Sequence, residues 1–444
     1  MITASLKDTV IPSVDVCKSI LTRHIQKMGV PLDYDRMLEY YSYYTVIAER
    51  HRSLVEKYIH YESIVPMKET QMKGFLKKNL TDLSMFLKTD GGDISLSGES
   101  IELAIQSGRL SKEMETLVYY WSKYATYSRK VSVIANIIND YPVCPIETFD
   151  NHRMILVKPS VVEQNTGRLG MVQPAIMNLD RELGDIRTVP KGWIHHESDS
   201  GQIEPRIIIS FFINDILVKK CILAYNDAYY GYLHYCTVLT PSERMDPNTV
   251  IKPLPITDEL KVLRQQFKNF GNSTMYGSTE NRLNNPNKAA FIRFLGGHPK
   301  RLKWQRECEA AIDRGVRVFH TAFGTPIDIT KGPSDARKRA MGEKAYYDHL
   351  VICAMNNPVQ GTAADLMRLS IVRANNLLQR KAPNSVITEY IHDSGKFAIH
   401  EDDYHKVIDE LKEITAYQVD DWIPIYSDST DGIKRSGPLE RLLQ

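Results

Sequence analysis

The chain has 444 residues, of which 43% are hydrophobic and 25% are charged. This length exceeds what one hydrophobic core usually serves, so we expect an ordinary globular protein built from two or three subdomains. The net charge is only +2, from 56 basic and 54 acidic residues, and does not by itself identify a nucleic-acid binder. Any basic surface must come from local clustering.

The six cysteines are scattered along the chain without a CxxC spacing, which argues against a zinc site and against a disulfide framework. A reducing cytoplasm fits that pattern. The amino terminus lacks a basic-then-apolar signal pattern, and no run of 18 apolar residues occurs. We therefore expect a cytoplasmic protein that is not a membrane partner.

Residues 1 to about 150 are predicted to be mainly helical, because apolar residues recur at helical spacing, as between Ile11 and Ile25. One predicted helix carries Lys68, Lys73, Lys77 and Lys78. Another, from about Ser111 to Ile138, interleaves aromatic and basic residues. Cations beside aromatic faces suit a nucleic-acid backbone. An amphipathic helix with its aromatic residues in the core and its lysines in water fits the same pattern.

From about residue 140 to 215 the pattern changes to short β-type runs, such as Met154–Val157 and Trp193–His195, and then to an apolar helix over 207–213. Residues 255–375 are predicted to be helical again, apart from polar loops at 284–287 and 325–335. The chain is expected to end with a hairpin and an amphipathic helix. These elements are predicted at 386–391, 396–399 and about 403–422.

Two of the predicted strands lead to an aspartate, Asp199 in the first case and Asp393 in the second. Paired Mg²⁺ ions about 3.5–4 Å apart require carboxylates from different strands, so the two aspartates suit a two-metal site. Each residue also has a structural explanation, because aspartate often caps a helix or occupies a turn. Gln202 and Glu204 fall in the first turn of the helix that follows Asp199.

Two further segments carry polar residues at informative spacings. If Arg264, Lys268 and Tyr276 share one helix, the two cations lie one turn apart on one face, as expected for a polyphosphate site or for a solvated basic face. The segment 356–367 contains Gln360 among small residues. Its amide suits the acceptors that every base pair shows in the minor groove, whereas the small residues also suit a helix packing face.

The order and spacing of these segments resemble DNA polymerase family A, over roughly residues 10–440. Residues 165–169 resemble the TGRL segment, with Asn178 beyond it. Residues 198–206 resemble motif A, and Arg264, Lys268 and Tyr276 resemble motif B, R-x3-K-x7-Y-G. Residues 356–365 are similar to NxPxQGTAAD, and 390–393 are similar to motif C.

The resemblance implies an α+β, right-hand polymerase fold with an antiparallel palm sheet, helical fingers and a helical thumb. It implies helices of the palm and thumb base at 1–60, a thumb at 61–139, palm segments at 140–215 and 351–444, and fingers at 216–350. It leaves no room for an exonuclease domain, so proofreading is expected to be absent or supplied in trans. A module of this kind suggests a phage or mobile element, in which case the location is the host cytoplasm.

The resemblance also implies the roles of individual residues. Asp199, Asp393 and the carbonyl of Ser200 are expected to hold two Mg²⁺ ions, with Lys268 as a further catalytic group. The residues expected to contact the incoming dNTP are Gln202, Ile203, Glu204, Arg264, Lys268, Tyr276 and His234. Those expected to contact primer-template DNA are Arg168, Asn178, Gln360, His392, Lys73 and Lys77. Glu204 is the implied steric gate against a ribose 2′-hydroxyl.

Some positions depart from the family pattern. Ser200 replaces the usual tyrosine of motif A, Pro205 follows the gate residue, and Ser394 replaces the usual glutamate of motif C. Asn272 lies where a phenylalanine or tyrosine is usual, with Phe270 nearby, so sensitivity to dideoxynucleotides is not predictable.

The expected function is primer-dependent DNA synthesis from dNTPs, with a separate exonuclease or processivity factor as a further partner. Two alternatives remain. One is a single-subunit phage-type RNA polymerase, which also has His-Asp-Ser in motif C. The other is a catalytically silent DNA-binding subunit.

Overall fold

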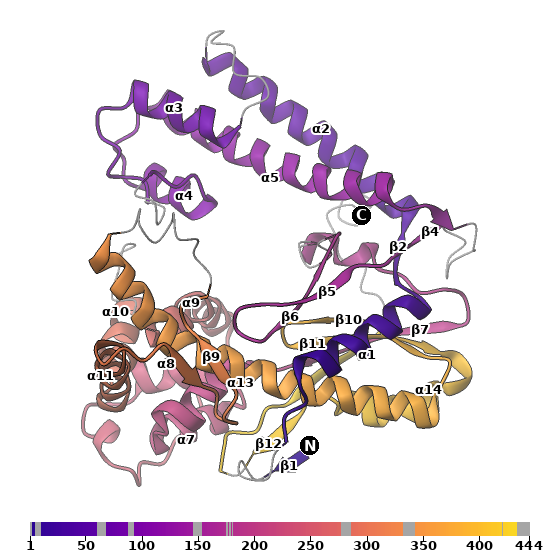
Figure 1. Ribbon diagram of the computed structural model, residues 1–444. Coiled ribbons are helices and arrows are strands. Elements are labelled where there is room, and N and C mark those ends of the chain that lie inside the picture. Colours follow the sequence, from indigo (N-terminus) through magenta and orange to yellow (C-terminus); the bar gives the residue numbers. More distant parts are fainter. Residues whose placement is uncertain are drawn as a thin grey trace.

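The central element is a four-stranded antiparallel sheet in the order β10-β11-β7-β13 (Figure 1). Its strands are β7 (Trp193–Ser200), β10 (Val386–Ile391), β11 (Ser394–His400) and β13 (Ser427–Asp431). Asp199 pairs with Ser394 on one side and with Asp428 on the other. The computed structural model describes residues 2–4, 10–59, 68–87, 93–144, 153–174, 176, 179, 181–276, 286–331, 342–419 and 421–432.

Three helices pack against this sheet, and they are α1 (Val14–Lys27), α13 (Glu343–Lys381) and α14 (Glu401–Lys412). Ser13 begins α1, because its side-chain oxygen accepts a hydrogen bond from the amide of Val16. Helix α13 is 39 residues long and contains the small-residue segment around Gly361. A Cβ at Gly361 would lie 2.1 Å from Cδ1 of Ile327, so glycine allows the hairpin β8–β9 (Val318–His320, Pro326–Asp328) to pack closely.

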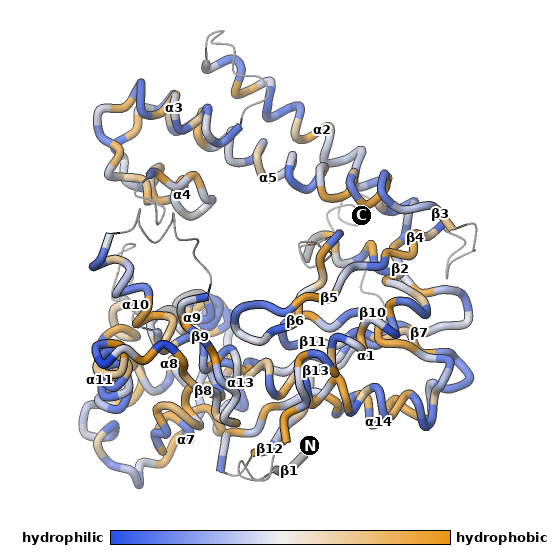
Figure 2. Tube along the Cα trace, viewed as in Figure 1, coloured by the Kyte–Doolittle hydropathy of each residue, from blue (hydrophilic) through white to orange (hydrophobic). Residues whose placement is uncertain are grey.

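Four helices of residues 34–140, which we call the thumb helices, extend away from this sheet (Figure 1). Helices α2 (Tyr34–Ile59) and α5 (Lys112–Asp140) lie side by side, and α3 (Glu69–Asn79) and α4 (Gly98–Gln106) pack near their outer ends. Polar and apolar residues alternate along these helices (Figure 2), as amphipathic helices require. The predicted helix over 111–138 is confirmed. Of its aromatic residues, Trp121 is buried, Tyr120, Tyr124 and Tyr127 are partly buried, and Tyr119 is exposed.

The finger helices occupy residues 203–313. They comprise α6 (Ile203–Ile207), α7 (Ile216–Tyr225), α8 (Ala228–Leu233), α9 (Asp258–Met275), α10 (Pro286–Phe291) and α11 (Pro299–Asp313), with π-helical turns at 208–213, 234–238 and 292–296 and a 3₁₀ turn at Glu243–Met245. Helices α7 and α8 pack so closely that a Cβ at Gly231 would lie 2.6 Å from Cα of Ile222. This approach requires glycine.

The remaining strands form small sheets. Strands β2 (Val30–Asp33), β4 (Met154–Val157) and β3 (Val143–Cys144) form one, β5 (Ser160–Glu163) pairs with β6 (Leu169–Val172), and β1 (Ile2–Ala4) pairs in parallel with β12 (Tyr417–Val419). A 3₁₀ helix spans Arg181–Ile186. Just after it, Arg187 reaches the central four-stranded sheet, which we call the palm sheet. There its Nε lies 2.7 Å from Oε1 of the buried Glu389.

The α+β, right-hand arrangement expected from the sequence is confirmed. Two predictions differ from the structure. Val318–His320 is a strand, although it lies in a region expected to be helical. The helix expected over 403–422 ends at Lys412, and Tyr417–Val419 is a strand. A tertiary contact favours the strand at Tyr417–Val419, because the hydroxyl of Tyr417 donates a hydrogen bond to the carbonyl of Leu366 in α13. Among the described residues, none of the helices is long and apolar enough to span a membrane.

Candidate active site

Asp199 and Asp393 lie next to each other at one end of the palm sheet. Asp199 is on β7, and Asp393 is in the turn between β10 and β11, where the amide of Ser200 donates to its carbonyl at 2.8 Å. The preceding residue, His392, has a φ of +54°, the left-handed conformation that lets this turn close in two residues. The two aspartates that the sequence singles out are therefore brought together by strand pairing.

Negative charge is concentrated around these aspartates. Burial, followed by the charges of Asp393, Glu197 and Asp428, raises the pKa of Asp199 to about 8, against the opposing charge of Lys268. Burial also raises the pKa of Asp393. Carboxylates held together at such a cost are stabilised when a cation joins them.

The donor set suits Mg²⁺. This ion prefers oxygen ligands and is often bound through one or two carboxylates together with water and substrate phosphates. Asp199 and Asp393 supply two carboxylates. Within the part of the chain that the structure describes, no group of three or more histidine, cysteine or acidic side chains is arranged to hold a metal by itself. The residues present therefore fit an ion whose coordination is completed by water and substrate.

Two acidic residues near this pair were not singled out from the sequence. Glu197 lies two residues before Asp199, and its Oε1 accepts a hydrogen bond from Oγ of Ser394 at 2.9 Å. Asp428 is opposite Asp199 on β13. The period of a strand could have indicated Glu197, because residues i and i−2 share a face. Asp428 becomes visible only with the strand order.

Glu204 is held between the palm and the fingers. Arg168, which precedes β6, forms an ion pair with its Oε1, and the hydroxyl of Tyr276 at the end of α9 donates to its Oε2 at 3.3 Å. Burial, together with the charge of Glu204, keeps the pKa of Tyr276 well above its ordinary value. Arg168 also lines a small cavity with His392, whose pKa is lowered by burial and by the charge of Arg168.

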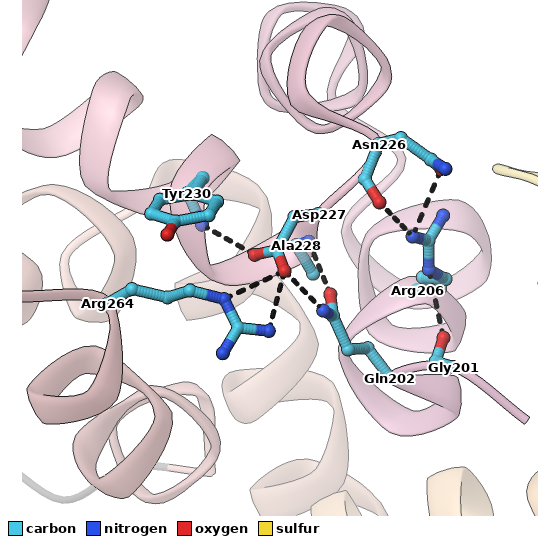
Figure 3. A network of polar contacts seen from close by, with 8 residues as sticks. All are labelled: Gly201, Gln202, Arg206, Asn226, Asp227, Ala228, Tyr230 and Arg264. Carbon is cyan, nitrogen blue, oxygen red and sulfur yellow. Dashed lines mark hydrogen bonds and ion pairs between the residues drawn. The ribbon is translucent and has the colours of Figure 1, made fainter. Parts of the chain in front are cut away.

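Arg264 and Gln202 meet at one carboxylate, that of Asp227 (Figure 3). Nε and Nη2 of Arg264 donate to Oδ2 of Asp227 at 2.8 and 2.6 Å, and Nε2 of Gln202 donates to the same oxygen at 2.6 Å. Oε1 of Gln202 accepts from the amide of Ala228 at 2.5 Å. Asp227 also caps α8 through the amide of Tyr230, at 2.9 Å. No motif in the sequence singles out Asp227.

The other residues expected to contact the nucleotide are placed differently. Lys268 is exposed on α9, one turn after Arg264, and its charge lowers the pKa of Asp199. Ile203 is only 2% exposed and belongs to the core. His234 is buried among the finger helices, where the hydroxyl of Tyr225 lies 2.9 Å from its Nδ1. The structure thus brings Lys268, and not the His234 ring, to the solvent-exposed side of the fingers.

The residues expected to contact DNA are dispersed. Arg168 and His392 lie beside the aspartates, and Gln360 is half-buried in α13. On α3, Lys73 pairs with Glu69 at 2.9 Å and Lys77 with Asp93 at 2.8 Å, so both lysines have acidic partners within the thumb helices. Asn178 lies outside the described residues, as do the side chains of Asn272 and Phe270.

This sheet, with Asp199 on β7, Asp393 in the neighbouring β10–β11 turn and the finger and thumb helices around it, has the fold of the right-hand polymerase class. A solved structure of this class, the POL domain of Pol1 from M. smegmatis in complex with DNA primer-template and dNTP, matches 95% of this chain and 70% of its own, with a TM-score of 0.71 and 15% identity. That likeness shows the fold.

The sequence comparisons match part of the chain to DNA polymerase family A. Residues 250–430, which contain the motif B, NxPxQGTAAD and motif C segments, match the model of DNA polymerase family A. The chain is 25% identical over 264 residues to the thermostable DNA polymerase I of Thermus thermophilus and 26% identical over 272 residues to that of Thermus filiformis. The chain is thus similar to DNA polymerase family A in its polymerase module. The alignments cover 56% and 57% of this chain, and 28% and 29% of those two relatives.

Proposed function

We propose that the chain catalyses template-directed, primer-dependent DNA synthesis from dNTPs. The observation that carries this proposal is the proximity of Asp199 and Asp393 at the end of the palm sheet, where burial and neighbouring carboxylates raise the pKa of both carboxyl groups. Asp393 and the residues Arg264, Lys268 and Tyr276 lie within the segment that matches the family A model. The M. smegmatis domain with the same fold was solved with DNA primer-template and dNTP, which supports these as substrates here.

Each group around the pair has a chemical task in this proposal. Asp199 and Asp393, with the Ser200 carbonyl, would hold two Mg²⁺ ions, which supply Lewis-acid stabilisation of phosphoryl transfer when bound. Arg264 and Lys268 bind the triphosphate and offset the charge that develops on the leaving pyrophosphate. Glu204, held by Arg168 and Tyr276, lies against the sugar. Arg168, His392 and Gln360 contact the primer-template.

The aspartates provide the direct test. Asp199→Asn and Asp393→Asn keep size and hydrogen bonding but remove charge from the metal site. Each should lower the rate of primer extension by about 1000-fold, or ~4 kcal/mol of transition-state stabilisation, while binding of a primed template remains close to wild type. Asp258→Asn is the control, because Asp258 is exposed and pairs only with Lys261 on α9. Near-normal extension by either active-site variant would refute the proposal.

An RNA polymerase is the second candidate, because residues 392–394 read His-Asp-Ser. The position of Glu204 between Arg168 and Tyr276 opposes it, since a carboxylate held there leaves less room for a 2′-hydroxyl. Extension of one primed template with dNTPs and with rNTPs decides between the two. A silent DNA-binding subunit is disfavoured because both aspartates are present and lie close together, with the amide of Ser200 bonded to the carbonyl of Asp393 and Asp199 opposite Ser394.

We also propose that the module extends primers without removing a mismatched 3′ end. The described segments form the palm sheet with the helices and small sheets around it, the finger helices and the thumb helices. A primer with a mismatched and labelled 3′ nucleotide tests this proposal. The label should persist during incubation with the pure protein, and its release would show an intrinsic exonuclease.

A further inference from the structure

Asp227 lies where the palm meets the fingers, and one of its oxygens has three donors. Arg264 contributes two of them and Gln202 the third, from the loop that follows β7 (Figure 3). The other oxygen caps α8. One carboxylate thus connects helix α9, helix α8 and the segment just after Asp199.

We propose, on the basis of the proposed function, that Asp227 is the positioning residue of Arg264 for the incoming triphosphate. The guanidinium is a planar fork, so fixing one edge fixes the direction of the other. The contacts with Asp227 use Nε and Nη2, which leaves Nη1 outside the pair. Asp227 therefore fixes the direction of the guanidinium, and Nη1 of Arg264 stays available to donate to a phosphate.

The surroundings of the pair strengthen this effect. The side chains of Arg264 and Asp227 are 26% and 14% exposed, so their attraction is less screened than that of a surface pair. The Arg264 guanidinium also lies 5.5 and 5.4 Å from the ring centres of Tyr229 and Tyr230. An arginine held in this way loses little side-chain entropy when the triphosphate binds. Without Asp227 that entropy is lost during binding, and the apparent affinity falls.

Gln202 connects the same carboxylate to the metal site. Its amide donates to Asp227 and accepts from the backbone of Ala228, so both ends of the side chain are held by the start of α8. Gln202 adopts a left-handed φ of +56°, three residues after Asp199. The position of α9 is thereby coupled to the strand that carries a metal-binding aspartate. Gln202 acts here through Asp227, in place of direct contact with dNTP.

The test uses a variant that removes the negative charge of Asp227 but keeps its capping of α8. Asp227→Asn retains a helix-capping side chain of the same size, since asparagine caps as well as aspartate, but it removes the negative charge. Asp227→Ser, another capping residue, is the second variant. The matched control is Asp215→Asn. Asp215 caps α7 through the amides of Leu217 and Val218 and pairs with His298, and it has no contact with Arg264 among the contacts described.

Single-nucleotide extension is measured for each variant, after the wild type has been shown to add dNTPs. Both Asp227 variants should raise the KM for dNTP about tenfold, which corresponds to ~1.4 kcal/mol, with kcat within about twofold of wild type. In an Arg264→Lys background, Asp227→Asn should cause no further change in KM, because the residue it positions is gone. Asp215→Asn should leave the KM unchanged in both backgrounds.

Three results would overturn the inference. An unchanged KM, with or without a lowered Tm, would show that Asp227 only caps α8. A lower KM would show that Asp227 competes with the triphosphate for Arg264. Equal effects of Asp227→Asn in the wild-type and Arg264→Lys backgrounds would show that it acts independently of Arg264. Failure of the wild type to add dNTPs would instead refute the proposed function, so the two failures are distinguishable.

Discussion

At residue 204 a carboxylate is fixed from two sides, by Arg168 and by the hydroxyl of Tyr276. In the proposed function this carboxylate occupies the space of a ribose 2′-hydroxyl. Glu204→Ala should therefore increase rNTP relative to dNTP incorporation by about 100-fold, or ~3 kcal/mol, because it removes a clash and an unfavourable polar contact. The measurement is the ratio of kcat/KM values for one rNTP and its matching dNTP on the same primed template.

Tyr276→Phe is the control for this prediction. It keeps the ring and removes the hydroxyl that donates to Glu204, so Glu204 loses one hydrogen bond while its side chain keeps its volume. We expect the increase in rNTP use to be much smaller than for Glu204→Ala. If the two variants relax sugar choice equally, the hydroxyl contact and not the bulk of Glu204 sets the selectivity.

Single residues show how far the sequence could predict the candidate site. Asp199, Asp393, Glu204 and Tyr276 carry motif patterns, and the fold brings them to the same end of the palm sheet. Glu197 and Asp428 have no motif pattern. Glu197 lies on the same face of β7 as Asp199, whereas Asp428 joins the site because β13 pairs with β7. Asp227 could not be predicted either, since its partners come from α9 and from the loop after β7.

Among the elements, helix α1 has a buried histidine at its contact with the palm. His24 is 8% exposed, its Nδ1 accepts from the amide of Ile387 at 3.4 Å, and its Nε2 lies 3.3 Å from Oδ1 of Asn375. Burial lowers the pKa of His24 from 6.5 to about 4, and the charges of Lys27 and Arg23 act in the same direction. The folded protein therefore keeps this imidazole neutral.

This burial makes stability depend on pH. In the unfolded chain His24 takes up a proton near pH 6.5, whereas in the folded protein it does so only near pH 4, so the unfolded state binds more protons between these values. Its contribution to stability is complete above pH 6.5 and is lost as the pH falls toward 4, with an upper limit of ~3 kcal/mol. Urea unfolding at a series of pH values measures the loss.

The matched variant is His24→Gln, which does not titrate in this range. Its free energy of unfolding should depend less on pH between 6.5 and 4 than that of the wild type. The comparison is needed because burial lowers the pKa of His195 to about 4 as well, so the wild type alone would combine two groups. Parallel pH curves for the two proteins would contradict the role assigned to His24.

Some helices and strands could be predicted from the sequence, and others could not. The long helices and the motif C hairpin follow from periodicity and turn residues, and they are where the sequence indicates. The prediction of a helix after Lys412 was wrong, because the buried residues Ala416, Tyr417 and Val419 fit both helical and strand periods. Contacts of Tyr417 with Ser370 and Leu366 on α13 decide in favour of the strand.

At the scale of the whole molecule, the buried hydrophobic residues form separate clusters of unequal size. One cluster joins the palm and the fingers, as Phe397 of β11, Leu366 of α13 and Phe267 of α9 belong to it together. The outer thumb helices have a separate cluster that contains Leu76 and Trp121. A third cluster lies around β2, β4 and the base of the thumb helices. The palm and fingers should therefore unfold as one unit, and the outer thumb as another.

Hydrogen exchange under native conditions tests this division. Amides of α3 and the outer part of α5 should exchange through an opening of lower free energy than amides of α13, because the smaller cluster buries less apolar surface. Trp121→Ala should lower the opening free energy of the outer thumb by about 3 kcal/mol and leave α13 unchanged. The matched variant Leu366→Ala should do the reverse. If all helices open together in the wild type, and both variants weaken protection everywhere, the molecule unfolds as one cooperative unit and the division is wrong.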